Sequence, residues 1–321
     1  MPGSGTYTFL EPEHYEARLR RAQIELVITG GTGFNARLTC AELHRLRLLR
    51  CEESLPRIGY VSLPPQLACI SFPANPDPLP KWRGAEMRAA DITFHSLGDR
   101  LHQTTLGPSI WSLIALDPAE LDHYSRILFE KPLSPPAEGR VLSPPKRDAA
   151  RLQRLHAQAS RLAQTKPKIL AHPEVARAIE EDLIHALVTC LTGAKVRDDR
   201  TGKRRHARTM VRFEEVLAEH LNRPLHLPEL CELVGVGDRT LRACCAEFLG
   251  ISATRYVLLR RLEAVRRALR DANSHIANVA EIAHRFGFAE LERFSETYQA
   301  TFGEAPLTTL QHVPRMRPSA P

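Results

Sequence analysis

The chain has 321 residues, of which 43% are hydrophobic and 25% are charged, so it can form two domains with ordinary cores. The net charge of +7 favours a polyanionic partner such as nucleic acid. No run approaches the roughly 20 apolar residues of a transmembrane helix, and the first 16 residues lack the basic start and apolar core of a secretory signal.

The seven cysteines are scattered along the chain and include no Cys-x-x-Cys pair. A disulfide framework or a zinc site is therefore not expected. Reduced thiols are typical of a cytoplasmic protein. We expect a cytoplasmic chain without a metal, a cofactor or a membrane segment.

Residues 1 to about 131 contain mainly short apolar or alternating segments, separated by clusters of Gly, Pro and Asn. This pattern is typical of an antiparallel sandwich or barrel. The predicted strands include 24–28, 34–38, 58–63, 67–72 and 111–116. Two stretches, 11–23 and 118–129, are predicted to be helical, the second with Asp117 as its N-cap and Pro118 at its first position.

A proline-rich connection, 131–145, is followed by two predicted amphipathic helices, 148–164 and 173–191. These helices could pack on the sheet or against a second copy of the chain. Segment 195–212 then carries eight Lys and Arg residues against two Asp residues. By composition it is a solvated linker, and it could also act as a basic arm that attracts phosphates.

Beyond this linker almost every segment is predicted to be helical. An apolar stripe over 210–221 stops at Pro224. A short helix over 228–234, a glycine-containing turn and a helix over 238–248 make a helix-turn-helix pattern. The second of these helices places Leu241, Cys244, Cys245 and Phe248 inward.

A long helix, 253–271, is predicted next, with an arginine-rich outer face made of Arg260, Arg261, Arg266, Arg267 and Arg270. Its length of roughly 27 Å approaches the roughly 34 Å between successive major-groove faces of B-DNA. The pattern then repeats, with helices over 276–286 and 290–302 around a Gly287-Phe288 turn. Gly303 ends the last helix as a left-handed cap would.

Residues 279–306 resemble the signature of AraC/XylS-type regulators. The positions that agree are Glu281, Ile282, Ala283, Gly287, Phe288, Phe294, Gly303 and Pro306, with Tyr298 where Phe is usual. Upstream, Arg239-x-Leu241, Gly250-x-Ser252, Tyr256 and Arg261-Leu262 resemble the first half of that domain. The resemblance covers about 209–312, roughly a third of the chain.

The resemblance implies a sequence-specific transcription regulator whose two helix-turn-helix units each present a recognition helix to the major groove of double-stranded DNA. It also implies RNA polymerase and a second copy of the chain as partners, with a small-molecule effector possible. The expected fold is α+β. A cupin-like sensing domain occupies 1–147, a helical dimerisation segment 148–193, a basic linker 194–208 and the double helix-turn-helix domain 209–321. The sequence specifies neither the effector nor the promoter nor the sign of regulation.

In the first recognition helix, Arg239, Thr240 and Arg242 are the predicted DNA contacts. An arginine can donate two hydrogen bonds to guanine O6 and N7, and Thr240 is placed for a phosphate or thymine. The alternative is that these are exposed residues without a base contact. Gly237 stands where a capping serine is usual in the family, and Ala243 removes a family contact.

The second recognition helix is acidic, and its candidate residues are Glu290, Glu292, Arg293, Ser295 and Glu296. Phosphates repel carboxylates, although a carboxylate can accept a hydrogen bond from the cytosine amino group. Arg293 and Glu296 are spaced to pair. Our hypothesis is that the first unit supplies most of the affinity. Arg260 and Arg261 are predicted either to touch phosphates between the grooves or to form a solvated face.

Other motifs point to no second function. Gly30-Gly-Thr-Gly33 lacks a following Lys-Ser/Thr and predicts a tight hairpin turn instead of a phosphate loop. His95, Asp99 and His102 are too few for a metal site and are expected to be rim residues or part of an effector pocket. Cys231, Cys244 and Cys245 are expected to be buried.

Two rival functions lack the motifs that they require. A DNA-repair alkyltransferase needs a Pro-Cys-His motif and a four-cysteine zinc site, and the sequence has neither. An enzyme built on the N-terminal barrel needs a nucleophile, a base and an orienting group, and no motif supplies them. We therefore expect no enzymatic activity.

Overall fold

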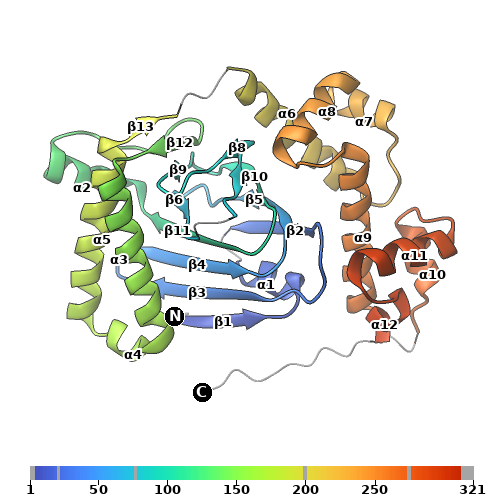
Figure 1. Cartoon of the computed structure of the whole chain (residues 1–321), viewed down its shortest axis with the longest axis horizontal. Coiled ribbons are helices and arrows are strands. Elements are labelled where there is room, and N and C mark those ends of the chain that lie inside the picture. Colours follow the sequence, from blue (N-terminus) through green and yellow to red (C-terminus); the bar gives the residue numbers. More distant parts are fainter. Residues whose placement is uncertain (1–3, 20–21, 76–77, 198–200, 273–275, 312–321) are drawn as a thin grey trace. The chain divides into compact units, whose positions relative to one another are not determined.

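The computed structural model describes residues 4–19, 22–75, 78–197, 201–272 and 276–311, with only the backbone of 201–204. The chain forms two compact units whose sequence boundary lies between Ala207 and Arg208. The N-terminal unit is rich in strands and the C-terminal unit is helical (Figure 1), which confirms the predicted α+β layout.

The N-terminal unit contains two antiparallel sheets. The larger sheet has the order β1 (Gly5–Phe9), β3 (Ala36–Glu42), β4 (Arg47–Glu53), β11 (Ser109–Leu116), β6 (Ala68–Pro73), β9 (Ile92–Phe94), β12 (Arg140–Ser143) and β13 (Lys195–Val196). The smaller sheet has the order β2 (Gln23–Ile28), β5 (Arg57–Ser62), β10 (Arg100–Thr105), β7 (Lys81–Trp82) and β8 (Ala85–Glu86).

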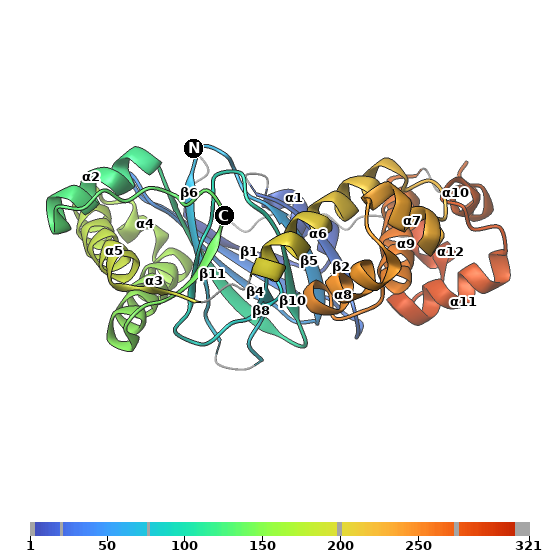
Figure 2. The ribbon, with the colours of Figure 1, turned by 90° about the horizontal axis from the view of Figure 1, so that it is seen from above.

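Each face of the larger sheet is covered by a different hydrophobic core, because side chains alternate along every strand. On β6, Ile70 and Phe72 belong to the core under the helices, whereas Cys69 belongs to the core shared with the smaller sheet. Helices α2 (Pro118–Phe129), α3 (Lys146–Thr165), α4 (Pro167–Leu170) and α5 (Pro173–Gly193) gather on one side of the strands (Figure 2). The two predicted amphipathic helices therefore pack on the sheet.

Three predictions for the N-terminal unit concern where helices and strands begin and end. Asp117 caps α2, since its carboxylate accepts the Ala119 N–H at 2.8 Å, as predicted. The predicted helix over 11–23 is shorter, because α1 (Pro12–Arg18) gives way to the apolar alternation of β2. The proline-rich connection also contains a strand, β12, which pairs with β9 on one side and with β13 on the other.

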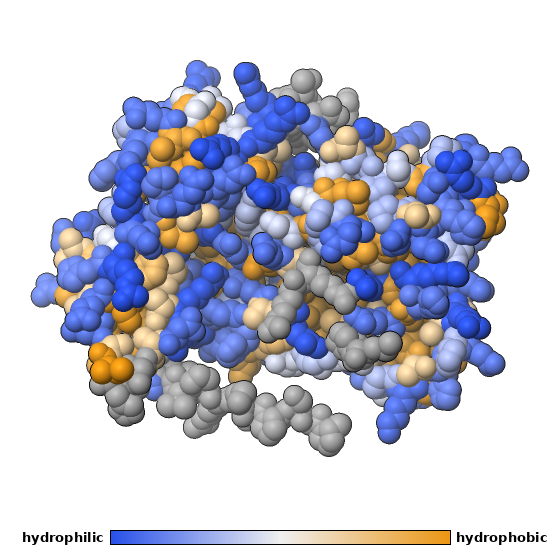
Figure 3. All heavy atoms as spheres, turned by 180° about the vertical axis from the view of Figure 1, so that it is seen from behind, coloured by the Kyte–Doolittle hydropathy of each residue, from blue (hydrophilic) through white to orange (hydrophobic). Residues whose placement is uncertain are grey.

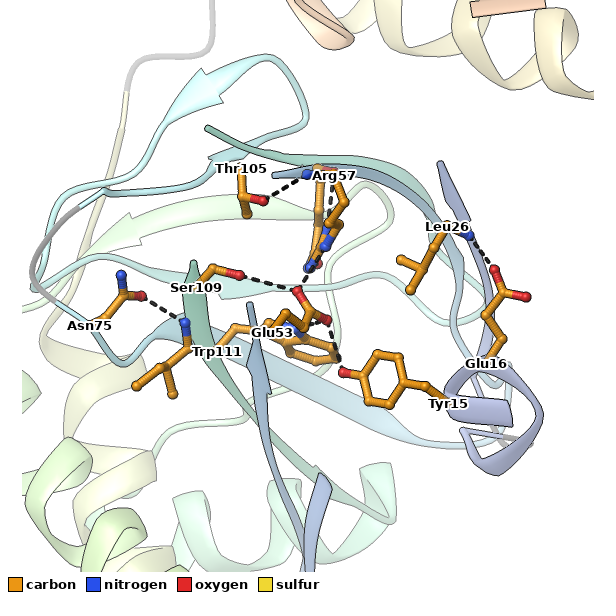
Figure 4. Close-up of polar contacts among 11 residues, drawn as sticks. Tyr15, Glu16, Leu26, Glu53, Arg57, Asn75, Thr105, Ser109 and Trp111 are labelled. Carbon is orange, nitrogen blue, oxygen red and sulfur yellow. Dashed lines mark hydrogen bonds and ion pairs between the residues drawn. The ribbon is translucent and has the colours of Figure 1, made fainter. Parts of the chain in front are cut away.

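A buried polar cluster around Glu53 joins several strands of the unit (Figure 4). One Glu53 oxygen accepts hydrogen bonds from the Tyr15 hydroxyl at 2.9 Å and the Trp111 indole at 3.0 Å. The other accepts from Arg57 at 2.8 Å and from Ser109 at 3.1 Å. Burial alone would raise the pKa of Glu53, but Arg57 and these hydrogen bonds outweigh it, so the pKa is lowered.

The C-terminal unit is a succession of helices. They are α6 (Thr201–Glu219), α7 (Leu227–Val234), α8 (Asp238–Phe248), α9 (Ala253–Asp271), α10 (Val279–Arg285), α11 (Leu291–Phe302) and α12 (Pro306–Gln311). No helix in the described ranges is long and apolar enough to cross a membrane. The face drawn in Figure 3 is mainly hydrophilic, with scattered hydrophobic groups.

Two predictions for this half of the chain are corrected. Within the basic segment expected as a linker, Lys195–Val196 forms strand β13 and the chain from Thr201 forms the first turns of α6, where Arg, Lys and Ala favour a helix. Residues 198–200 of this segment lie outside the described residues. Helix α10 starts at Val279, three residues later than predicted, since Asn278 caps it by accepting the Ala280 N–H at 2.8 Å. Ile276, predicted to face inward, is consequently 82% exposed.

Candidate nucleic-acid interface

The first helix-turn-helix unit consists of α7, a turn and α8. Gly235 ends α7 with a φ of 77°, a left-handed conformation that favours glycine. The predicted inward residues of α8 (Leu241, Cys244, Cys245 and Phe248) are all buried. Burial raises the pKa of Cys245 to about 12, so this thiol stays protonated and packs as a small hydrophobic group.

The outer face of α8 carries the predicted reading residues. Arg239 and Arg242 are exposed and Thr240 is half-buried. Arg242 donates from Nε to the Asp238 carboxylate at 2.7 Å, which leaves its terminal NH groups to face a ligand. Gly237 caps the helix without a side-chain hydrogen bond, and Asp238 in the first turn instead supplies the negative charge that a helix N-terminus favours.

Arg260 and Arg261 do not form an exposed face on the connecting helix α9, so this prediction is wrong. Arg260 is 7% exposed, and its NH2 lies 3.7 Å from the Glu214 carboxylate of α6. Glu214 also accepts the Tyr256 hydroxyl at 2.6 Å. The contacts of Glu214 with Arg260 and Tyr256 therefore join α6 to α9 inside the C-terminal unit.

Arg261 is 9% exposed and holds the second helix-turn-helix unit, α10 and α11, onto α9. Its Nε and NH2 donate to the Phe286 carbonyl at 3.0 and 2.6 Å. Its guanidinium also lies 4.3 Å from the ring centre of Phe288. The prediction failed because other helices cover not only the apolar stripe of α9 but also part of its arginine-rich face. The spacing of apolar residues within one helix does not reveal such coverage.

Other arginines of α9 also serve the inside of the unit. Arg266 lies 3.2 Å and Arg270 3.8 Å from the Glu304 carboxylate. Thr309 donates to the same carboxylate at 2.9 Å and accepts the Tyr298 hydroxyl at 2.9 Å. Arg266 and Arg270 of α9 thus hold the C-terminal end of the second helix-turn-helix unit in place.

The second helix-turn-helix unit consists of α10, a turn at Gly287 and α11. Gly287 has a φ of 75°, and a Cβ there would lie 2.5 Å from the Pro224 Cδ, so the position requires glycine. Phe294 and Tyr298 of α11 pack with Leu262 and Val265 of α9. Gly303 ends α11 with a φ of 74°, which confirms the predicted left-handed cap.

The outer face of α11 is acidic, as the sequence indicates. Glu290, Glu292, Arg293 and Glu296 are exposed, while Ser295 is half-buried. The predicted Arg293–Glu296 ion pair does not form in the described part of the chain. This face carries three carboxylates and one guanidinium, and it would be repelled by DNA phosphates.

Two N-terminal motifs receive a structural explanation. The glycine-rich segment 30–33 connects β2 and β3, which lie in different sheets, so the predicted hairpin is wrong. Gly31 and Gly33 adopt positive φ values in this crossing loop. No phosphate-binding helix follows, because the next element is strand β3.

His95 and Asp99 belong to a buried relay that includes a residue the sequence did not suggest. The Ser71 hydroxyl lies 2.6 Å from His95 Nε2, and Asp99 lies 3.0 Å from His95 Nδ1. Arg83 pairs with Asp99 at 2.6 Å. Only strand pairing brings Ser71 to His95. With Ser71 1% and His95 2% exposed, a substrate cannot reach the hydroxyl, and the relay is structural.

His102 lies outside this relay and packs against Tyr60, with 5.0 Å between ring centres. Within the described residues, no three His, Cys, Asp or Glu side chains are grouped to hold a metal ion.

Comparison with known proteins agrees with this architecture. A family model described as a helix-turn-helix domain matches residues 230–312. XylDLEGF operon transcriptional activator 2 of Pseudomonas putida is 34% identical over 99 residues, which are 31% of this chain and 63% of that protein. The transcriptional regulator GbdR of Pseudomonas aeruginosa is 31% identical over 110 residues, which are 33% of this chain and 29% of that protein.

Among solved structures, the AraC-like transcriptional activator CuxR is 16% identical, with 81% of this chain and 94% of that chain covered and a TM-score of 0.41. A probable AraC family transcriptional regulator from Rhodopseudomonas palustris CGA009 is 28% identical, covers 32% of this chain and 94% of that chain, and has a TM-score of 0.30. The chain spans about 31% of the length of the first curated relatives that it matches. Residues 230–312 are therefore a helix-turn-helix domain that is similar in sequence to the matching segments of these transcriptional activators and regulators.

Proposed function

We propose that the chain is a sequence-specific, DNA-binding transcription regulator. The observation that carries this proposal is the exposed pair Arg239 and Arg242 on α8, in a helix-turn-helix unit whose opposite face is fully packed. Guanidinium groups on an exposed recognition helix suit the O6 and N7 acceptors of guanine in the major groove. Double-stranded DNA is the proposed partner.

The two helix-turn-helix units would contribute unequally to DNA binding. Helix α8 offers Arg239, Thr240 and Arg242, whereas α11 offers mainly Glu290, Glu292 and Glu296. Carboxylates near phosphates weaken the attraction that supplies much of DNA affinity. The first unit is therefore the main source of affinity, and Glu292, Arg293, Ser295 and Glu296 read few bases.

The N-terminal unit would sense an effector, and the regulator would act as a cytoplasmic homodimer that contacts RNA polymerase and carries no enzymatic activity. Helices α3 and α5 are the proposed dimer contact, through the sides that do not cover the sheet. Those sides are mainly charged, and Arg151 and Asp182 form an ion pair there at 3.8 Å. Sedimentation of the full chain at two salt concentrations tests this assembly.

DNA binding is tested by gel shift of the full chain on its own upstream DNA, across a salt series. Arg239→Ala and Arg242→Ala should each weaken binding to the preferred sequence, because a bidentate guanine contact is worth about 1–3 kcal/mol. Arg37→Ala, which removes an exposed arginine from β3 and not from the proposed dimer contact, is the matched control. Equal, weak binding to all DNA, unchanged by the two α8 variants, would refute the proposal.

A further inference from the structure

A cavity in the N-terminal unit is built on one face of the larger sheet. The strand register places Glu42, Arg47, Ala115 and Cys69 in one row across β3, β4, β11 and β6. The neighbouring row contains Cys40, Leu49 and Leu113. All seven side chains line the cavity, which Leu19, Ala22 and the 64–67 segment close from the other side.

The cavity is apolar inside and has a volume of about 250 Å³. Leu38, Leu48 and Cys69 on its walls are each 1% exposed. At ~30 Å³ for each water-sized group, this volume holds about eight non-hydrogen atoms. A cavity with such a lining favours a compact hydrocarbon body over a sugar or a nucleotide.

The mouth of the cavity is charged. It carries the exposed Arg18 and Glu42 and the half-buried Arg47. Among the described residues at the mouth, two arginines stand against one glutamate. Arg18 already stacks on Tyr7, at 4.0 Å from the ring centre. Across the described residues, the Arg47 guanidinium makes no hydrogen bond or ion pair, although Glu42 faces it across the strands.

The two thiols in the walls do not add reactive chemistry. Burial raises the pKa of Cys40 to about 11 and that of Cys69 to about 12. Both therefore remain neutral thiols near pH 7 and serve as small wall residues. Recognition depends on the apolar walls and the arginines at the mouth.

We propose that this cavity binds a compact apolar molecule with one carboxylate, and that Arg47 receives the carboxylate. The proposal identifies the effector class of the sensing unit, and thus rests on the proposed function. An unpartnered guanidinium beside an apolar cavity matches a ligand with one anionic end and one hydrocarbon end.

Calorimetry with the full chain tests the proposal with a matched pair of probes, cyclohexanecarboxylate and cyclohexanecarboxamide. The two have nearly the same shape and differ in charge. The carboxylate should bind about tenfold more tightly, as expected for a charge-assisted hydrogen bond. Arg47→Gln should abolish that preference, whereas Arg37→Gln, an exposed arginine of β3 outside the cavity, should keep it.

Ala115→Leu provides a second variant, because Ala115 lies directly across from Arg47 and a larger side chain there fills the cavity. It should weaken both probes. Equal affinity for the two probes, no binding of either at millimolar concentration, or a preference that survives Arg47→Gln would each overturn the proposal. The calorimetry uses no DNA, so failure of the chain to bind its upstream DNA would count against the proposed function alone.

Discussion

Replacing Arg261 with glutamine separates a structural role from a DNA contact. In the wild type its guanidinium donates twice to the Phe286 carbonyl and lies over Phe288, with 9% exposure. The shorter glutamine cannot reach both partners. We therefore expect the α10–α11 unit to loosen from α9, while the number of phosphate contacts stays the same.

The magnitude follows from the two interactions that the substitution removes. Leaving the Phe286 carbonyl without its donors costs about 1–3 kcal/mol, and removing the cation from the Phe288 ring costs about 0.5–2 kcal/mol. A total of about 1.5–5 kcal/mol corresponds to roughly 10- to 5000-fold faster amide exchange in α10 and α11, since each 1.36 kcal/mol is tenfold.

Hydrogen exchange by mass spectrometry on the full chain measures this destabilisation, and gel shifts across a salt series measure the phosphate contacts. Arg255→Gln, at an exposed position of the same helix, should leave exchange in α10 and α11 unchanged. The reasoning is refuted if Arg261→Gln leaves exchange unchanged but lowers the salt slope by about one unit, the signature of a missing phosphate contact.

Three further substitutions and one pH dependence can be predicted from the same structure. Glu53→Gln should destabilise the N-terminal unit by about 3–5 kcal/mol, because it leaves buried Arg57 without its partner charge; urea unfolding followed by the two tryptophans, both in this unit, measures it. Because the pKa of Glu53 is lowered from 4.5, its stabilisation should be complete above pH 4.5 and fall as the pH drops below that value, so a wild-type midpoint that does not fall on acidification contradicts the assignment. Gly287→Ala should weaken the second unit by about 1–3 kcal/mol, as seen in amide exchange, while Gly237→Ala, where a Cβ meets nothing within 4 Å, should not. Glu292→Gln should tighten binding to all DNA similarly in gel shifts; weaker binding at a single cytosine position would instead make Glu292 a base reader.

Helix positions in the C-terminal unit followed closely from the sequence. The predicted bounds of α8 and α9, 238–248 and 253–271, agree with the structure. Apolar spacing of three and four residues and the glycines at the turns act within one or two helical turns. The same local signals predicted α2 and its Asp117 cap.

What the sequence did not reveal depends on segments that are distant in the chain. The burial of Arg261 requires the end of α10, 25 residues away. The Ser71–His95 contact and the row of Glu42, Arg47 and Ala115 require the strand register. Side-chain periodicity indicates which face is buried, but not which strand or helix covers it.

The close packing of Gly287 on Pro224 has a consequence for the DNA that the proposed regulator would select. Pro224 lies between α6 and α7, so this contact braces the turn of the second unit against the segment that leads into the first. A protein braced in this way has a fixed spacing between its two recognition helices, and the duplex must adjust to it. Sites with easily kinked pyrimidine–purine steps would need less energy for that adjustment. The regulator would therefore prefer certain sequences at base pairs that no side chain touches.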